Sequence, residues 1–468
     1  MVRSFSYNII HNYNYIYMAL EIFNTLSREK EVFQPIESKK VGLYTCGPTV
    51  YNYVHIGNWR AYVFTDLLKR YLKYSGYEVK HVMNITDVED KIIREVKAQN
   101  KSLKELTEFY TKEFFNGRDL LNIQPADIIT KATDYIDEMV ALIKKLEEKG
   151  YAYKTEDSSV YFDIHKDKEY GKLSHFKLSE LKENADGRLK KDEYEKENAE
   201  DFALWKAWDE NDGNVFWETK LGKGRPGWHI ECSAMSMSKL GESFDIHTGG
   251  VDNIFPHHEN EIAQSECATG KSFAKYFMHN EHLLVDNKKM SKSLGNIYTI
   301  DDLIKKGIDP IAFRMWLYTS NYSTRTNFTI EAVSGSQVAL TRLKEAFLAL
   351  GDDIGTINQA YKVRFMEFLD NNLDSPQALA LVWELLKDTS LSNTDKKATL
   401  LDFDKVLGLG LEKIKEEIIP DEIINLAKER EQARKEKDWA KSDELRDKIN
   451  GLGYEIKDSD SGTKISRI

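Results

Sequence analysis

Residues 40–58 of the chain read KVGLYTCGPTVYNYVHIGN, and this stretch decides the fold. Its first seven residues are typical of a short buried strand, the following residues form a loop, and apolar periodicity predicts a helix from about Asn58 to Tyr74. Gly76 ends that helix, and a second strand follows over residues 77–85. Strand, loop, helix and strand form a βαβ unit. This unit predicts a parallel sheet with a right-handed crossover and a ligand site beyond the carboxyl ends of its strands.

The first half of the chain predicts further α/β structure around this unit. Helices are expected over residues 91–122 and 130–149, and strands over residues 243–247 and 277–285. The fold class is therefore α/β, with a Rossmann-like parallel sheet in the first part of the chain.

The second half of the chain predicts helices. From Ile330 to Leu411 apolar residues recur at helical spacing, which indicates a helix bundle. After a break near residues 417–421, the highly charged segment 421–451 is expected to be helical and to end in a polar tail.

Composition places the chain among ordinary soluble globular proteins. Of its 468 residues 41% are hydrophobic and 31% charged, and it lacks an apolar run of the roughly 18 residues that a membrane span needs. Three cysteines, Cys46, Cys232 and Cys267, argue against a disulfide framework and suit the cytosol. A net charge of −11 gives no general attraction for nucleic acid, although a local basic surface would suffice. Residues 1–18 do not resemble a secretory signal and are expected to be disordered or not native.

A candidate metal cluster lies in residues 224–265, which contain GRPGWHIECSAM and FDIHTGGVDNIFPHHENEIAQS. Pro256 suits the first position of a helix, which would place His257 and Glu261 one turn apart on one face. A thiol, an imidazole and a carboxylate are usual zinc ligands, but such a cluster alone is weak evidence for a metal. The residues concerned are Cys232, His247, His257, His258 and Glu261.

Two further motifs carry chemistry only as a pair. His55–Asn58 (HIGN) lies where a helix begins, so its free N–H groups favour a phosphate, Gly57 allows close approach and His55 can donate to a phosphate oxygen. By itself, a histidine there is more often a helix cap or a core residue than a phosphate ligand. Lys289–Ser293 (KMSKS) by itself is an exposed basic loop. A strand–HIGN–helix unit followed by KMSKS resembles the signature of the class I aminoacyl-tRNA synthetases, in which both motifs bind ATP.

Within that class the chain resembles the cysteinyl-tRNA synthetases from about Ala19 to its C-terminus. The matching blocks, in the family's order, are TCGPTVYNYVHIGN, NITDVEDKII, DFALWK, GRPGWHIECSAM, FPHHENEIAQS and KMSKSLGN. Two positions depart from the family pattern: Asn58 replaces the final histidine of the common HIGH form, and Thr248 stands where glycine is frequent.

The resemblance implies a set of site residues. The catalytic residues would be His55, Lys289 and Lys292. The ATP-binding residues would be His55, Gly57, Asn58, Gly249, Gly250, Asp252, Lys289, Ser291 and Lys292, with the Asp252 carboxylate on a ribose hydroxyl. The amino-acid pocket would be lined by Thr86, Trp228 and His247. Zinc would be held by Cys46, Cys232, His257 and Glu261, with His258 outside the ligand set and Cys267 a small apolar residue.

The resemblance also implies the domains, cofactors and partners. We expect an N-terminal extension (1–18), a catalytic domain (19–330, with an insertion at about 120–215 and a KMSKS and stem-contact region at about 286–330), a helical bundle (331–415) and an anticodon-binding domain (420–468). The expected cofactor is one zinc ion, and ATP with Mg²⁺ is a substrate. The expected partners are L-cysteine and tRNA(Cys), for a cytoplasmic monomer that does not bind membranes. Basic residues of the last helices, Arg430 and Arg434 among them, and Trp439 would contact the tRNA.

Zinc would serve to select the substrate. Cysteine and serine differ by one atom, and a pocket that reads shape alone gains only ~10–200-fold from so small a difference. Zinc binds a thiolate far better than a hydroxyl. Two other functions stay open: a mycothiol-type cysteine ligase with an amino-sugar acceptor, and a nucleic-acid-binding module with a structural zinc. A zinc hydrolase is disfavoured, because four protein ligands leave no position for an activated water.

Overall fold

A computed structural model of the chain describes residues 19–175, 201–290, 294–414, 420–459 and 462–467. At its centre lies a five-stranded sheet in the order β12-β11-β3-β4-β5, in which every neighbouring pair is parallel. This sheet confirms the predicted α/β fold class. Its strands are β3 (Lys40–Thr45), β4 (Glu78–Ile85), β5 (Ile128–Lys131), β11 (Phe244–Gly250) and β12 (Ala274–Asn280).

The strand order reverses between β3 and β11, because the chain continues from β3 to β4 on one side and returns to β11 on the other. In open parallel sheets such a switch point forms a crevice at the carboxyl ends of the strands. Thr45 of β3 is in register with Thr248 of β11, and the Cys46 N–H donates to the Thr248 carbonyl oxygen at 3.4 Å. Cys46 therefore lies at this crevice.

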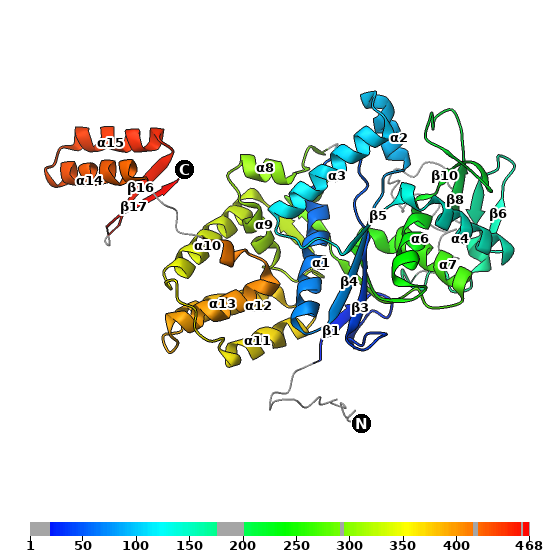
Figure 1. The fold of residues 1–468 in the computed structure, drawn as a ribbon, viewed down its shortest axis with the longest axis horizontal. Helices are drawn as coiled ribbons and strands as arrows, with labels where there is room; N and C mark the ends of the chain where they lie inside the picture. Colours follow the sequence, from blue (N-terminus) through cyan, green and yellow to red (C-terminus); the bar gives the residue numbers. More distant parts are fainter. Residues whose placement is uncertain (1–18, 176–200, 291–293, 415–419, 460–461, 468) are drawn as a thin grey trace. The chain divides into compact units, whose positions relative to one another are not determined.

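Helices cover both faces of the sheet (Figure 1). α1 (Ile56–Tyr74) packs on β4 and β11, and α6 (Trp228–Leu240) packs on β3 and β4 from the other face, next to α7 (Glu259–Thr269). α1 is buried along most of its length because helices from the second half of the chain cover its outer side, as its contact with α13 (Asn393–Leu407) shows.

Two expected helices are shorter than the apolar pattern suggested. The segment 91–122 forms α2 (Asp90–Gln99) and α3 (Leu103–Leu120). Asn100 has a left-handed φ of 49° that ends α2, and Ser102 begins α3 with a capping box to Glu105, so local capping outweighs the continuous pattern. The segment 130–149 begins with the end of β5, continues through a 3-10 turn at Ala132–Asp134 and becomes α-helical only in α4 (Ile136–Glu148).

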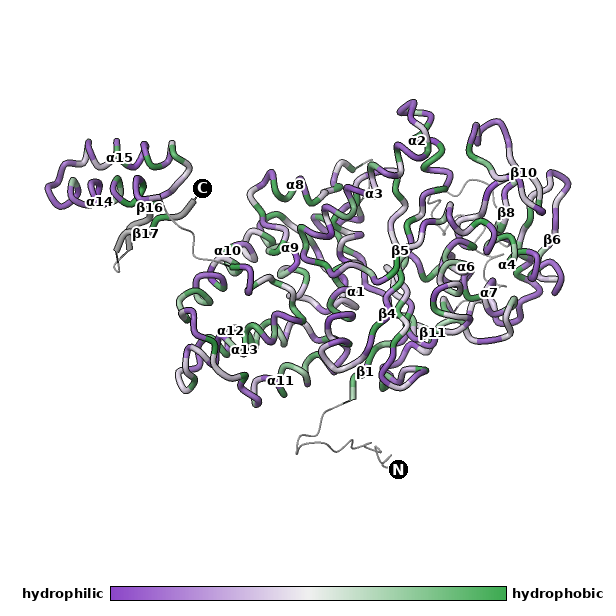
Figure 2. The backbone as a smooth tube through the Cα atoms, in the orientation of Figure 1, coloured by the Kyte–Doolittle hydropathy of each residue, from purple (hydrophilic) through white to green (hydrophobic). Residues whose placement is uncertain are grey.

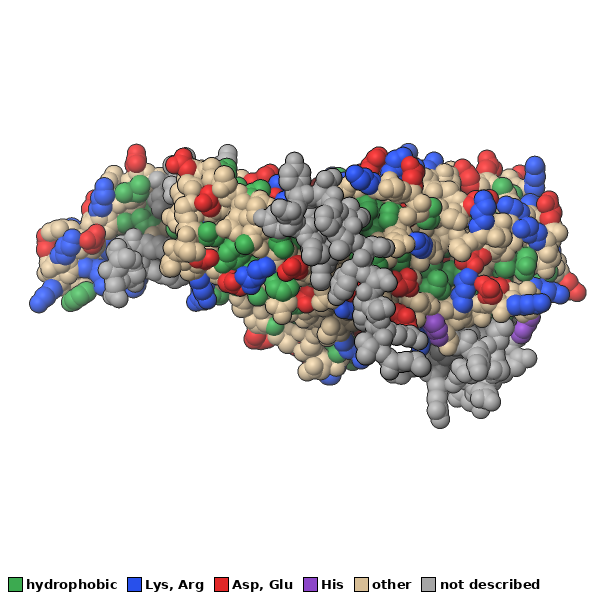
Figure 3. Space-filling view, turned by 90° about the horizontal axis from the view of Figure 1, so that it is seen from below, with side chains coloured by type: hydrophobic (Ala, Val, Ile, Leu, Met, Phe, Trp, Pro, Cys, Tyr) green, Lys and Arg blue, Asp and Glu red, His purple; other side chains and the backbone are tan. Residues whose placement is uncertain are grey.

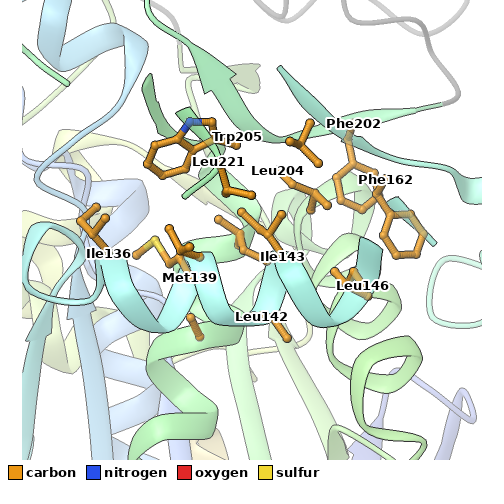
Figure 4. Close-up of a cluster of buried hydrophobic side chains, with 14 of the residues drawn as sticks. Ile136, Met139, Leu142, Ile143, Leu146, Phe162, Phe202, Leu204, Trp205 and Leu221 are labelled. Carbon is orange, nitrogen blue, oxygen red and sulfur yellow. The ribbon is translucent and has the colours of Figure 1, made fainter. Parts of the chain in front are cut away.

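An antiparallel sheet lies beyond α4, in the region expected to be an insertion. Figure 4 shows Ile136, Met139 and Ile143 of α4 pointing toward Leu204 and Trp205 of this sheet. The strands run in the order β6-β7-β8-β10-β9. They are β6 (Ala152–Lys154), β7 (Val160–Phe162), β8 (Phe202–Ala207), β9 (Trp217–Thr219) and β10 (Gly222–Pro226).

A small three-stranded sheet carries the KMSKS segment. Its order is β14-β13-β15, with β13 and β14 forming a hairpin that ends at Lys289. Its strands are β13 (Leu283–Val285), β14 (Lys288–Lys289) and β15 (Thr326–Phe328). A separate hairpin near the start of the chain comprises β1 (Glu21–Asn24) and β2 (Glu29–Val32).

Helices then dominate, as the apolar spacing predicted. They are α8 (Ile300–Lys305), α9 (Pro310–Leu317), α10 (Ile330–Leu348), α11 (Gln359–Asp370), α12 (Ser375–Lys387) and α13. A buried ion pair joins α9 to α1, where Arg314 Nη2 lies 2.5 Å from Asp66 Oδ2. The same guanidinium donates to the Leu407 and Leu121 carbonyl oxygens, so it links α13 and the end of α3 to α1.

The chain divides into two compact units, residues 1–412 and 413–468. The second unit contains α14 (Asp421–Lys435), α15 (Trp439–Gly451), β16 (Tyr454–Ser459) and β17 (Gly462–Arg467). The expected polar tail is thus an antiparallel hairpin. Hydrophilic and hydrophobic residues alternate along α14 and α15 (Figure 2), and the hydrophobic ones, Ile423, Leu426, Leu445 and Ile449 among them, form the core of this unit.

The surface charge is mixed. On the face shown in Figure 3, acidic and basic side chains are interspersed. None of the described helices combines the length and the apolar character that a membrane span requires.

Candidate active site and metal centre

The four residues predicted to bind metal come together at the crevice. Cys46 follows β3, Cys232 lies in α6, and His257 and Glu261 lie in and just after the turn that enters α7. One ligand atom from each lies within 4.8 Å of every other. The two Sγ atoms are 3.8 Å apart, and His257 Nε2 is 3.0 Å from Glu261 Oε1. These donor types and this spacing fit a zinc ion.

A kink precedes the segment that carries His257 and Glu261. Phe255 is extended (φ −135°, ψ 133°), and the helical backbone resumes at Pro256 and continues into α7, which is α-helical from Glu259. His257 and Glu261 are therefore adjacent, as expected from their spacing of four residues.

Two more histidines, His247 and His258, lie within hydrogen-bond distance of the predicted metal ligands. His258 Nε2 is 3.3 Å from Cys46 Sγ, and His247 Nε2 is 2.9 Å from Glu261 Oε2. Cys46, His247, His258 and Glu261 therefore form a second group with metal-ligand spacing. His258 Nδ1 also pairs with His279 Nε2 at 2.8 Å. The sequence analysis did not single out His279, and the available signal was its place near the carboxyl end of a buried strand.

Burial sets the protonation of these groups. It lowers the pKa of His258 far below the ordinary value and that of His279 to about 3, so both imidazoles are neutral. Burial opposes the charged form of His257 as well, but the Glu261 carboxylate and Cys232 together outweigh it and raise the His257 pKa. The hydrogen bond from the Cys46 thiol lowers the pKa of Cys232 to about 6, whereas burial raises that of Cys46. A thiolate and neutral imidazoles are the forms in which these side chains bind metal.

The two nucleotide motifs meet beside the cluster. His55 is the N-cap of α1, its Nδ1 accepting from the Asn58 N–H at 3.3 Å, and the Ile56 N–H donates to the Tyr298 carbonyl oxygen just after the KMSKS segment. A Cβ on Gly57 would lie 2.3 Å from Met290 Cε, so the HIGN and KMSKS segments are in contact. Ser291 and Lys292 lie outside the described residues.

Asp252 links the glycine pair to the KMSKS hairpin. Its carboxylate lies 3.2 Å from His282 Nδ1 and 3.6 Å from Lys289 Nζ. Burial favours the neutral acid, but His282 and Lys289 outweigh it and lower the pKa of Asp252, which is therefore ionised at neutral pH. Gly249 must lack a side chain, because a Cβ there would lie 2.7 Å from His258 Cε1, whereas a Cβ on Gly250 would meet no atom closer than 4.0 Å.

The predicted amino-acid pocket residues surround the cluster. The Trp228 ring stacks on His257, with centroids 4.1 Å apart and an interplanar angle of 25°. Thr86 follows β4, is buried, and accepts a hydrogen bond from Asn84 Nδ2 at 3.1 Å. Trp228 and His247 thus contact residues of the cluster, whereas Thr86 lies beside Glu231.

The sequence analysis missed Glu231, which lies between Trp228 and Cys232 on α6. Its side chain is 1% exposed, and neither carboxylate oxygen has a hydrogen-bond partner in the described parts of the chain. Burial raises the pKa of Glu231 well above its ordinary value, nearby Cys232 and Asp87 add to the rise, and Thr86 opposes it. Its position in the sequence, directly before the predicted metal ligand Cys232, could have identified Glu231 as a candidate site residue.

Comparison with known proteins first defines the class. Residues 32–338 match the family model described as the class I (C) tRNA synthetase catalytic domain, and residues 418–465 match the cysteinyl-tRNA ligase anticodon binding domain. The fold is shared with methionyl-tRNA synthetase of Mycobacterium tuberculosis in complex with methionyl-adenylate (TM-score 0.54, 15% identity, 79% of this chain and 90% of that chain). It is also shared with a leucyl-tRNA synthetase, LeuRS, of Agrobacterium radiobacter in a ternary complex with tRNA (TM-score 0.58, 10% identity, covering 82% of this chain and 85% of that chain). The first unit therefore contains a class I aminoacyl-tRNA synthetase catalytic domain, over residues 32–338.

Full-length relatives narrow the class to one family. The cysteine–tRNA ligase of Chlamydia felis is 46% identical, covering 96% of this chain and 98% of its own. That of Brachyspira hyodysenteriae is 45% identical, covering 95% and 98%. The chain belongs to the cysteine–tRNA ligase family.

Proposed function

We propose that this chain is a cysteine–tRNA ligase, which activates L-cysteine with ATP and transfers it to the 3′ end of tRNA(Cys). Family membership carries this proposal, and the convergence of the HIGN and KMSKS segments beside a Cys/His/Glu cluster supports it. The match to an anticodon-binding domain disfavours both an amino-sugar acceptor and a mere structural-zinc module.

In the first step a carboxylate oxygen of cysteine attacks the α-phosphorus of ATP, and the bond to pyrophosphate breaks. No side chain has to act as nucleophile, so the residues orient the reactants and stabilise the developing charge. His55, Gly57 and Asn58 at the start of α1 hold the α-phosphate, and Lys289, Ser291 and Lys292 hold the phosphates that leave with Mg²⁺. Gly249 and Gly250 let the nucleoside approach, and Asp252 accepts from a ribose hydroxyl.

In the second step a hydroxyl of the terminal tRNA ribose attacks the carbonyl carbon of the adenylate, and AMP leaves. The second unit reads the anticodon. Trp439 is 58% exposed, and the Arg434 guanidinium lies 5.8 Å from its ring centroid, which forms a platform for stacking a base. Arg430, in contrast, is buried and belongs to the interior of this unit.

Cys46, Cys232, His257 and Glu261 would hold zinc, and His247 and His258 would support the Glu261 carboxylate and the Cys46 sulfur. A zinc ion bound there supplies a soft acceptor that distinguishes the substrate thiolate from a hydroxyl. Thr86, Trp228 and His247 form the walls around the substrate. Trp228 can serve as a wall because its stacking on His257 holds the ring beside the cluster.

We further assign residues 19–330 to the catalytic domain, with its insertion at about 120–215, residues 331–415 to the helical bundle and residues 420–468 to the anticodon-binding domain. We assign the enzyme to the cytoplasm as a monomer. The three cysteines are unpaired, which suits a reducing compartment.

The decisive experiment is cysteine-dependent ATP–pyrophosphate exchange with Lys292→Ala. The variant should lose ~10²-fold or more, the usual effect of removing one electrostatic contact to a transition state. Lys288→Ala is the matched control, because Lys288 is an exposed lysine that lies close to Lys292 in the sequence but outside the motif. Near-normal exchange by Lys292→Ala would refute the assignment of this lysine, and no exchange by the wild type would refute the function.

A further inference from the structure

Glu231 presents an unexplained buried carboxylate. It is 1% exposed, and neither oxygen makes a well-formed hydrogen bond with the described residues, although the Thr86 hydroxyl lies near enough to favour the ionised form. A buried charged group without a partner is costly, so such a group usually marks a place where something binds. The carboxylate lies beside Cys232 and Thr86, which are a predicted metal ligand and a predicted wall of the amino-acid pocket.

The carboxylate faces a small pocket that Trp228 also lines. The two basic residues of this pocket are already neutralised: Lys206 pairs with Asp90, and Arg225 pairs with Asp90 and Asp212. Glu231 is therefore left without a counter-charge in this pocket, and a bound cation would stabilise its ionised form.

The neighbouring carboxylates are engaged in the fold. Glu89 caps α2 by accepting from the Lys91 N–H, and Asp87 accepts from the backbone N–H and the hydroxyl of Thr133. Among these three acids, Glu231 alone keeps both oxygens available within the described structure.

The substrate carries the matching group. In cysteine only the β and α carbons separate the sulfur from the amino nitrogen. A thiol placed at the Cys232 and His257 cluster therefore brings the ammonium group close to the wall formed by Trp228, Thr86 and Glu231. An ammonium group has three donors, and a carboxylate has only acceptors.

We propose that the Glu231 carboxylate binds the α-ammonium group of the cysteine substrate. This inference rests on the proposed function and adds a specificity-determining residue to it. The metal cluster binds the thiol of the substrate, and Glu231 binds its amino group. A thiol compound without an amino group would gain nothing from Glu231.

The test measures binding by the zinc-loaded full-length enzyme, using calorimetry with three thiols. L-cysteine has both an amino and a carboxylate group, cysteamine lacks the carboxylate, and 3-mercaptopropionic acid lacks the amino group. Glu231→Gln should bind cysteine and cysteamine about 10- to 100-fold more weakly, as expected for a hydrogen bond between charged groups, and should bind 3-mercaptopropionic acid as the wild type does. Glu89→Gln is the matched control, since the Glu89 side chain lines the same pocket but caps a helix.

Equal weakening of all three thiols, or no weakening of any, would overturn the proposal, because a structural carboxylate does not distinguish the ligands by their amino group. Zinc content is measured on each variant. If Glu231→Gln does not fold or retain zinc, Glu231→Asp supplies the same comparison, with a smaller loss confined to the two amines. Wild-type enzyme that binds cysteine without catalysing pyrophosphate exchange would refute the proposed function and leave this inference standing.

Discussion

Gly57 offers a direct test of the contact between the HIGN and KMSKS segments. The Gly57→Ala substitution adds a Cβ 2.3 Å from Met290 Cε and 3.1 Å from two atoms of the His55 ring. Ordinary contact begins at 3.4 Å, so Met290 must retreat by about 1 Å. The end of the Met290 side chain is flexible, and the change should therefore lower the unfolding free energy by no more than ~1–2 kcal/mol.

The effect on catalysis should be much larger than the effect on stability. A misplacement of about 1 Å in an active site can reduce the rate ~10²-fold, and the added methyl group also blocks the close approach of a phosphate. We expect the kcat/KM for ATP in pyrophosphate exchange to fall about 10²-fold, with little change in the KM for cysteine.

Two further variants complete this test. Gly335→Ala is the control, because Gly335 lies in α10 with open space around it, and this change should leave activity intact. Met290→Ala in the Gly57→Ala background removes the clashing atom and should restore part of the lost activity. Exchange by Gly57→Ala within about threefold of the wild type would refute the role of this contact in ATP binding.

Three other perturbations follow from the structure. Removing zinc with a chelator should abolish the preference for cysteine over serine in pyrophosphate exchange, and a preference that persists in metal-free enzyme would contradict the selection role. Deleting residues 420–468, which lie in a separate compact unit, should reduce aminoacylation at least ~10-fold more than cysteine activation, and equal damage to both would count against a tRNA role. Asp66→Asn should destabilise the enzyme by about 3–5 kcal/mol in urea unfolding at pH 7, because it leaves Arg314 buried without its carboxylate. Burial disfavours the charged form of Asp66, but Arg314 and Arg70 lower its pKa below the unfolded value of about 3.9. Its contribution should therefore be present above that value and be lost as the pH falls through the lower folded pKa; a difference between wild type and Asp66→Asn that stays constant through this range would contradict the reasoning.

Much of the candidate metal cluster was predictable because its residue types are rare and chemically distinctive. His257 and Glu261 are close in sequence, so their proximity needs little tertiary information, whereas Cys46 was included through the family resemblance. The kink at Phe255 was not predictable, since the sequence around Pro256 gives the same local pattern with or without it. His258 was predicted to lie outside the ligand set and to contact the ligands or the substrate, and the structure places its Nε2 3.3 Å from Cys46 Sγ.

The sequence by itself determined the parallel sheet, the helical second half and the chemical identity of the site. These depend on local periodicity and on residue types that only a few reactions need. Only the tertiary structure decided what lies beside Glu231. Glu231 is buried because residues of α6, of the antiparallel sheet and of the segment after β4 pack around it. These residues are distant from one another in the chain, so the burial of Glu231 cannot be read from its local sequence. The same holds for Gly57 and Met290, which are 233 positions apart in the numbering and meet only because the strand order reverses between β3 and β11.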